Sequence, residues 1–335
     1  MKVGIITFYN HINYGAILQS YALQTKLNNL GIDAFHICFS KKDNNNDTEK
    51  PFVSNIPLLK KIHDEDEIRK KHFNDFRTKY IKEKYFANEL IEDTDLFIVG
   101  SDQVWNPKIT NANPVYFANF APNEKKVSYG ASFGEDLPEQ YKEIYSKEIK
   151  SFNKISVREE SAKKTVKELT GLDVQVVLDP VFLLKKNEWE TLLKNKHDEK
   201  KYLLLIILQN DIDIYKKYKL KASKLGLEFK VIALSRFFNI GFESWSRISV
   251  QDYLNLIYNA QYVVTNSFHG LAFSIIFEKS FEIIELKGEM EKRKIRLLDL
   301  IQKLRLKKQD NGINANIYLK KEMEISERFI KEILK

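Results

Sequence analysis

The sequence lacks the features of several protein classes. It has one cysteine, Cys38, in 335 residues, so no disulfide can form within the chain and no thiolate cluster can hold a metal. No apolar run approaches the roughly 18 residues that cross a bilayer. The first eight residues have the pattern of a buried strand and not of a signal peptide. We therefore expect a cytoplasmic protein.

Nucleotide-binding motifs are missing as well. The loop Tyr9–Gly15, after the first expected strand, contains neither the three-glycine dinucleotide fingerprint nor the Walker lysine. The formal charge of +8 arises from 54 basic and 46 acidic residues that are interspersed along the chain. This pattern predicts no nucleic-acid partner. The modest positive excess favours anionic substrates or an anionic membrane surface.

Proline is missing from the chain after residue 180. All seven prolines lie between Pro51 and Pro180, which indicates a change of organisation soon after residue 180. With 43% hydrophobic residues, the chain is long enough for two domains with their own cores. We place the boundary near residue 185, which gives an N-terminal lobe of residues 1–185 and a C-terminal lobe of residues 186–335.

Strand-like runs alternate with helical stretches in both lobes. The expected strands cover residues 3–8, 34–39, 96–99, 126–131, 155–158 and 173–178 in the first lobe, and 202–208, 229–234, 262–265 and 281–285 in the second. Such alternation predicts an α/β fold with parallel sheets. The simplest architecture has two Rossmann-like lobes that face a cleft, with ligand-binding strand ends on both sides.

The clearest candidate site follows the expected strand 262–265. Asn266, Ser267 and His269 lie between this strand and an apolar helix, in the stretch TNSFHGLAF. In an α/β sheet this position is the carboxyl edge of the strand, where N–H groups at the helix start stabilise an anion. A histidine there can bind phosphate or transfer a proton. A capping or packing role for His269 is the simpler alternative.

Polar residues also follow a strand end in the first lobe. Ser101 and Asp102 follow the strand 96–99 after Gly100, and Trp105 is close by. A carboxylate beside an aromatic ring suits the binding of a sugar hydroxyl. The alternative is an aspartate that forms a turn next to a core tryptophan.

Two further strand ends carry candidate ligands. Arg158 ends the strand 155–158, where it can bind a carboxylate or phosphate, or pair with Glu159 or Glu160. The loop FYNHINYGA after the first strand supplies Asn13, and Gly15 permits close approach of a ligand to the backbone.

Six motifs together resemble a known family. In chain order they are NYGAILQSYAL, GSDQVWNP, SYGASFG, ISVREESA, LDPVFLL and TNSFHGLAFS. The set resembles the polysaccharide pyruvyl transferase family from about residue 3 to residue 285. The resemblance implies a glycosyltransferase-B-like (GT-B-like) fold. It also implies transfer of the enolpyruvyl group of phosphoenolpyruvate to a sugar, which forms a pyruvate ketal during capsule or exopolysaccharide biosynthesis, with no cofactor or metal.

The resemblance also implies roles for individual residues. His269 matches the position of an acid or phosphate ligand, Asp102 that of a base or sugar ligand, and Arg158 that of a donor ligand. The N–H groups after Asn266 and around Gly15 would assist in binding the donor.

One position departs from the family pattern. Many members have arginine two residues before the histidine, where this chain has Ser267. We expect Arg293, Lys294 or Arg296, at the start of the next helix, to supply the missing charge.

Two other functions fit the same architecture. A glycosyltransferase would hold a nucleotide sugar in the second lobe, with Glu285 or Glu289 as the nearest carboxylate candidates. A non-catalytic relative would bind a sugar without turnover. For the pyruvyl transferase, a lipid-linked acceptor would place the protein at the inner face of the membrane, where the basic helix Lys287–Lys308 can assist attachment.

Overall fold

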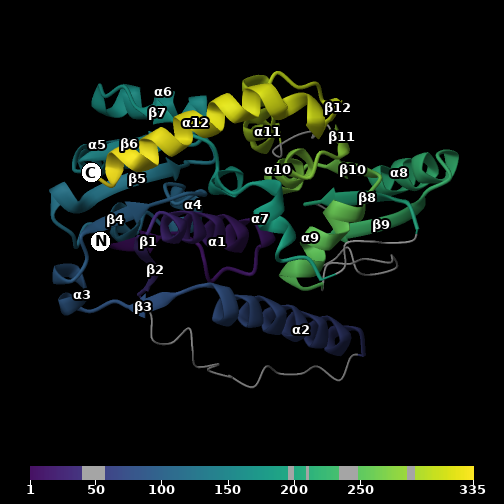
Figure 1. Cartoon of the computed structure of the whole chain (residues 1–335), viewed down its shortest axis with the longest axis horizontal. Coiled ribbons are helices and arrows are strands. Elements are labelled where there is room, and N and C mark those ends of the chain that lie inside the picture. Colours follow the sequence, from purple (N-terminus) through teal and green to yellow (C-terminus); the bar gives the residue numbers. More distant parts are fainter. Residues whose placement is uncertain (40–56, 195–199, 209–210, 234–247, 285–290) are drawn as a thin grey trace. The chain divides into compact units, whose positions relative to one another are not determined.

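The chain forms two compact α/β units (Figure 1). The computed structural model describes residues 1–39, 57–194, 200–208, 211–233, 248–284 and 291–335, without the side chains of 57–63 and 291–295. The first unit comprises the described residues within 1–48, 77–184 and 320–335, and the second those within 49–76 and 185–319.

The units differ from the two continuous lobes expected from the sequence. The division after Leu184 lies next to the expected boundary. However, residues 320–335 belong to the first unit, because Phe329, Ile330 and Ile333 are buried in its core. The amphipathic pattern of a helix shows that one face is buried, but it does not show which sheet covers that face.

The first unit contains a seven-stranded parallel sheet of order β3-β2-β1-β4-β5-β6-β7. Its strands are β1 (Lys2–Ile6), β2 (Asp33–Cys38), β3 (Glu83–Tyr85), β4 (Leu96–Val99), β5 (Lys126–Ala131), β6 (Lys154–Val157) and β7 (Gln175–Val176). Alternate residues enter two apolar clusters: Phe97 and Val99 join one, whereas Leu96 and Ile98 join the other. Burial on both faces explains why a central strand such as β4 is a continuous apolar run.

The helices of the first unit connect successive strands. They are α1 (Tyr14–Asn29), α3 (Asn88–Glu92), α4 (Pro107–Thr110), α5 (Lys142–Lys150) and α6 (Glu160–Thr170). Helix α2 (Pro57–Tyr80) contributes residues to both units. Helix α12 (Asn316–Ile333), yellow in Figure 1, ends against the first sheet, and its Ser326 Oγ accepts a hydrogen bond from the backbone N–H of Leu178 at 2.9 Å.

The second unit contains a five-stranded sheet of order β12-β11-β10-β8-β9, in which only β12 is antiparallel to its neighbour among the described pairs. Its strands are β8 (Tyr202–Ile207), β9 (Glu228–Ala233), β10 (Tyr262–Thr265), β11 (Ser280–Ile283) and β12 (Gln309–Asn311). Its helices are α7 (Lys186–Glu190), α8 (Ile212–Lys224), α9 (Val250–Asn259), α10 (Phe268–Ile276) and α11 (Glu291–Lys303). The predicted α/β class with parallel sheets is confirmed.

A histidine is buried in the first sheet. His36 on β2 is fully buried, and its ring lies against Tyr9 with centroids 4.8 Å apart. Burial lowers the pKa of His36 to about 3, and the backbone of Ser20 offsets only part of this effect. The histidine is therefore neutral in the folded protein at neutral pH.

The buried histidine predicts a loss of stability in acid. Below about pH 6.5 the unfolded chain binds a proton at His36 that the folded protein does not bind, so the free energy of unfolding falls as the pH falls. Between about pH 7 and pH 5 this term amounts to about 2 kcal/mol. The variant His36→Phe keeps a ring against Tyr9 but has no group to titrate here. Between pH 7 and pH 5 we expect its free energy of unfolding to fall by about 2 kcal/mol less than that of the wild type. Urea titrations at both pH values test this, and equal pH dependence in the two proteins would contradict it.

Candidate active site

Asp102 lies at the carboxyl edge of the first sheet. The chain leaves β4 through Gly100 and Ser101, and Asp102 then adopts a left-handed conformation with φ of 69°. Its backbone bridges to β5: the carbonyl accepts a hydrogen bond from Ser132 N–H at 3.0 Å. The carboxylate accepts a hydrogen bond from Gln103 N–H at 2.9 Å, and the side chain is 13% exposed. The backbone thus fixes a carboxylate that solvent can still reach.

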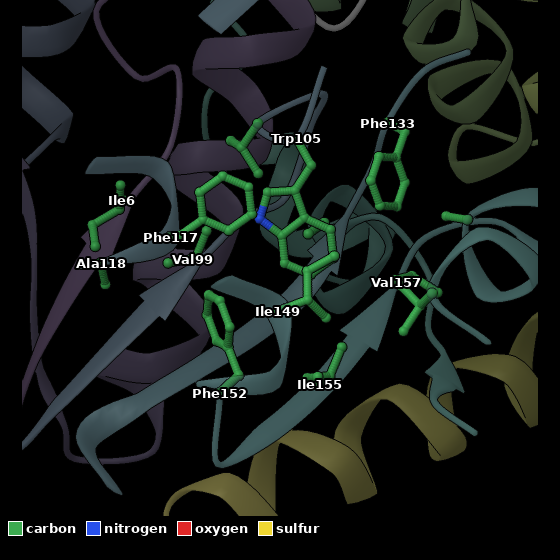
Figure 2. Packing of buried hydrophobic residues seen from close by; sticks show 14 of the residues in the cluster. Ile6, Val99, Trp105, Phe117, Ala118, Phe133, Ile149, Phe152, Ile155 and Val157 are labelled. Carbon is green, nitrogen blue, oxygen red and sulfur yellow. The ribbon is translucent and has the colours of Figure 1, made fainter. Parts of the chain in front are cut away.

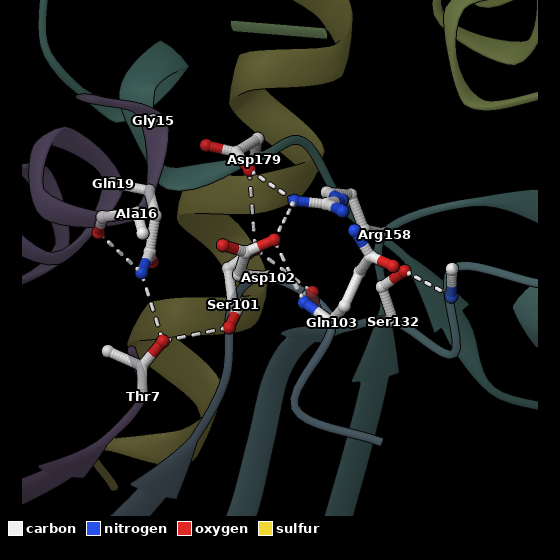
Figure 3. Close-up of polar contacts among 12 residues, drawn as sticks. Thr7, Gly15, Ala16, Gln19, Ser101, Asp102, Gln103, Ser132, Arg158 and Asp179 are labelled. Carbon is white, nitrogen blue, oxygen red and sulfur yellow. Dashed lines mark hydrogen bonds and ion pairs between the residues drawn. The ribbon is translucent and has the colours of Figure 1, made fainter. Parts of the chain in front are cut away.

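Arg158 is enclosed by carboxylates (Figure 3). Its side chain is 2% exposed, and Nη1 lies 2.8 Å from Oδ2 of Asp179 and 3.7 Å from Oδ1 of Asp102. Its Nε lies 3.3 Å from Oε2 of Glu159. Pairing within the protein, which was one of the two sequence-based alternatives for Arg158, is present, and the role of Arg158 as a donor ligand remains a prediction. Arg158 pairs with Glu159, as expected, and also with Asp179, which the sequence analysis did not consider.

The charges in this cluster do not balance. One guanidinium faces three carboxyl groups, which gives a formal charge of −2 if all of them are ionised. Burial would lower the pKa of Arg158, but Glu159, Asp179 and Asp102 more than offset this effect and raise it. Arg158 therefore stays cationic, and the protein's own carboxyl groups lie against its guanidinium.

Two residues of this cluster, Asp179 and Ser132, were not predicted from the sequence. Asp179 is fully buried, and its Oδ1 accepts a hydrogen bond from Val181 N–H at 3.1 Å, which caps the 3-10 helix Pro180–Leu183. Glu159 accepts a hydrogen bond from the hydroxyl of Ser132. The signal for Asp179 was its place before proline at a helix start, which also suits an ordinary cap.

A hydrogen-bond chain connects the cluster to α1. Gln19 Nε2 donates to Thr7 Oγ1 at 2.9 Å, and Thr7 Oγ1 donates to the carbonyl of Ser101 at 2.9 Å (Figure 3). The Ser101 hydroxyl in turn donates to the Gly130 carbonyl at 3.0 Å. Ser101, predicted as a substrate ligand, is fully buried, and its hydroxyl bonds within the protein.

The start of α1 has its own cap. Asn13 Oδ1 accepts hydrogen bonds from the N–H groups of Gly15 at 2.9 Å and Ala16 at 3.2 Å. A ligand at Gly15 would compete with this cap. The binding roles predicted for Asn13 and Gly15 remain predictions.

Trp105 does not form an aromatic wall of a site, which corrects the prediction. Its ring is fully buried in the apolar cluster of the first unit and is stacked on Phe117 with centroids 5.9 Å apart (Figure 2). The indole N–H donates to the carbonyl of Tyr116 at 3.2 Å. Because surrounding side chains cover both the ring and its N–H, Trp105 cannot stack on a sugar.

In the second unit, the predicted elbow between strand and helix is present. Ser267 is the N-cap of α10, and its hydroxyl accepts a hydrogen bond from Gly270 N–H at 3.3 Å. Gly270 packs so closely that an added Cβ would lie 2.6 Å from Thr265 Oγ1. His269 follows in the first turn and is half-buried, with its ring edge-on to that of Phe268. The helix start therefore holds His269 at the carboxyl edge of β10.

Asn266 has an unsatisfied donor at the same edge. The residue is 1% exposed, and its Oδ1 accepts a hydrogen bond from Leu208 N–H at 2.9 Å, which joins the ends of β10 and β8. Its Nδ2 has no hydrogen-bond partner among the described residues. A buried donor without a partner costs roughly 1–3 kcal/mol, so an acceptor atom of a ligand would stabilise this position.

Most of the other predicted charges cannot be placed. Arg293 and Lys294 lie on α11, but their side chains are outside the described part of the structure. Arg296 on the same helix is half-buried, and its role remains a prediction. Glu285 and Glu289 lie entirely outside the described residues. Within the described residues, no group of three or more histidine, cysteine, aspartate or glutamate side chains could hold a metal ion. No described helix is long and apolar enough to cross a membrane.

Comparison with known proteins shows the family of the chain. A family model described as polysaccharide pyruvyl transferase matches residues 13–284. No curated protein matches the sequence.

Solved structures share the fold over the whole chain. UDP-GlcNAc 2-epimerase from Neisseria meningitidis, bound to UDP-GlcNAc, is 11% identical, with 100% of each chain covered and a TM-score of 0.51. UDP-N-acetylglucosamine 2-epimerase from Rickettsia bellii is also 11% identical, with 100% of this chain and 96% of that chain covered and a TM-score of 0.51. The predicted GT-B-like fold is confirmed.

Proposed function

The chain belongs to the polysaccharide pyruvyl transferase family, and we propose that it transfers the enolpyruvyl group of phosphoenolpyruvate to a sugar and closes a pyruvate ketal. The family match over residues 13–284 is the observation that carries this proposal. The acceptor is a sugar or lipid-linked oligosaccharide of a surface polysaccharide such as a capsule. The protein would act in the cytoplasm at the inner face of the membrane.

We assign the acceptor sugar to the edge of the first unit. A sugar hydroxyl is neutral, so the negative cluster of Asp102, Glu159 and Asp179 does not repel it. Asp102 has the most exposed side chain of the three carboxylates. It can therefore accept the hydroxyl proton as a general base. Arg158 then orients Asp102 instead of binding the donor.

We assign the anionic donor to the edge of the second unit. The start of α10 favours negative charge because the positive end of the helix dipole lies there. The buried Nδ2 of Asn266 is a donor without a described partner, and it can bind a carboxylate or phosphate oxygen. His269 on the first turn can protonate the methylene carbon or hold the phosphate.

The atoms of the proposed reaction balance. The oxygen of one sugar hydroxyl bonds to C2 of phosphoenolpyruvate, its proton passes to Asp102, and an acid, assigned to His269, protonates the C3 methylene. The C2–O bond to phosphate then breaks, and a second hydroxyl of the sugar bonds to C2 and loses its proton. The products are the ketal and inorganic phosphate, with no change of oxidation state overall and no metal ion required by any step.

Thermal shift with phosphoenolpyruvate tests the donor assignment. A ligand that binds only the folded protein raises the free energy of unfolding and with it the melting temperature. At a ligand concentration of a hundred times the Kd, the free energy of unfolding rises by about 2.7 kcal/mol. We expect the wild type and Arg158→Lys to be stabilised, because Arg158 is occupied by protein carboxylates. His269→Ala is expected to lose most of the shift. If Arg158→Lys folds normally but loses the thermal shift, Arg158 binds the donor and our assignment is wrong.

A parallel titration with UDP-N-acetylglucosamine separates the alternative enzyme class. Because one fold serves many reactions, the epimerase neighbours give no reason to expect this ligand. Stabilisation by the nucleotide sugar alone would reject the proposed donor and favour a glycosyltransferase. Stabilisation by phosphoenolpyruvate alone would support pyruvyl transfer.

A further inference from the structure

One helix of the second unit has an unusual outer face. The inner face of α8 is buried in the core through Tyr215, Tyr218 and Ala222. Three large apolar residues instead point away from the core: Ile212 is 50% exposed, Leu220 57% and Leu225, at the end of the helix, 53%. Single exposed apolar residues are common on protein surfaces, but Ile212 and Leu220 lie on one short helix and Leu225 directly follows it.

The same helix carries positive charge without a carboxylate partner, although Lys217 and Lys219 contact the rings of Tyr218 and Tyr215. Four exposed lysines of α8 form no ion pair with any carboxylate in the described part of the chain: Lys216, Lys217, Lys219 and Lys224. The remaining lysine, Lys221, pairs with Glu282 on β11. Asp213 is the one acidic residue within the helix. The charge of this face is therefore not neutralised by the protein.

The positions of these residues place both kinds of group on one stripe. Ile212, Lys216, Leu220 and Lys224 follow at intervals of four, so they form one row along the helix. Lys217 and Lys219 flank this row. Apolar and cationic side chains thus alternate along the outer surface of α8.

We propose that the outer face of α8 binds an anionic membrane surface. Leucine and isoleucine can enter the boundary between headgroups and acyl chains, while lysine stems lie beside them and the ammonium groups reach lipid phosphates. A nucleic acid would match the lysines but would leave Leu220 and Leu225 without an apolar partner. An ordinary solvent-exposed helix face would not require exposed leucine residues. The lipid surface is the partner that matches both kinds of side chain.

This surface differs from the one expected from the sequence. The basic segment Lys287–Lys308 was predicted to assist attachment, but α8 combines lysines that have no carboxylate partner among the described residues with exposed leucine and isoleucine. The inference does not depend on the reaction that the protein catalyses. If the acceptor is lipid-linked, attachment through α8 would keep the second unit at the membrane that holds it.

Vesicle co-sedimentation tests the inference with the whole chain. The probes are vesicles of phosphatidylcholine alone and of phosphatidylcholine with about one third phosphatidylglycerol, at low and high salt. We expect the wild type to bind the anionic vesicles and to be released by salt. Because each lysine near the surface contributes about 1 kcal/mol, Lys216→Gln/Lys217→Gln/Lys224→Gln should bind on the order of a hundredfold less. Leu220→Ser should reduce binding several-fold.

A matched variant controls for net charge. Lys147→Gln/Lys150→Gln/Lys167→Gln removes three exposed lysines from α5 and α6 of the first unit, and it should bind nearly as well as the wild type. Circular dichroism verifies that every variant is folded. Equal loss in the two triple variants, or no binding of the wild type to anionic vesicles, would overturn the inference.

Discussion

Replacing Arg158 by methionine is expected to lower the free energy of unfolding by about 4 kcal/mol, because a buried ion pair that loses one partner leaves uncompensated charge. The substitution removes the cation that lies between Asp179, Glu159 and Asp102. Methionine fills much of the same volume, so the loss reports charge more than packing. Urea unfolding followed by far-UV circular dichroism measures the effect.

A control for this prediction lies in the same unit. Arg328 on α12 is exposed and forms no ion pair with the described residues, so Arg328→Met should change stability by less than about 0.5 kcal/mol. A loss below about 1 kcal/mol for Arg158→Met would mean that the three carboxyl groups do not need the guanidinium. In that case Arg158 would be free to serve a ligand.

Replacing Gly100 by alanine is expected to destabilise the first unit by about 3 kcal/mol. Gly100 has φ of 111°, and an added Cβ would lie 2.5 Å from the carbonyl oxygen of Tyr129 and 3.2 Å from the N of Ala131. Both contacts are with the backbone of β5, which cannot rotate away. The turn that carries Asp102 would have to move, so we also expect activity to fall with stability.

Gly31→Ala isolates the contribution of steric contact. Gly31 also has a positive φ, of 81°, but nothing lies within 4 Å of an added Cβ. It should cost only about 1 kcal/mol, from the left-handed conformation alone. The melting temperatures of the two variants compare the effects directly. Similar losses would show that the contacts of Gly100 with β5 are relieved at little cost.

The local pattern of the sequence was sufficient for the fold class. Apolar runs at residues 96–99 and 202–208 predicted buried parallel strands, and both are present, as Leu96–Val99 and Tyr202–Ile207. The turn after Tyr262–Thr265 predicted that Ser267 and His269 would lie at a helix start, and they do. These features depend on residues close together in the chain, so hydrophobic period and capping chemistry determine them.

The partners of the buried polar residues were decided only in three dimensions. Arg158 can pair with any nearby acid, and its closest partner, Asp179, is 21 residues away along the chain. Trp105 follows a polar turn in sequence, yet the packing of Phe117 against it makes it part of the core. The same sequence pattern suits a ligand wall or a core ring, and tertiary packing selects between them.

By itself, the sequence determined the alternation of strands and helices, the position of His269 at the start of α10, and the family. The tertiary structure decided which carboxylates Arg158 pairs with and that the C-terminal helix packs on the first sheet. The physical reason is the range of the interactions. Backbone conformation and helix caps are set by neighbours in the chain, whereas burial and ion pairing depend on which distant segments the fold brings into contact.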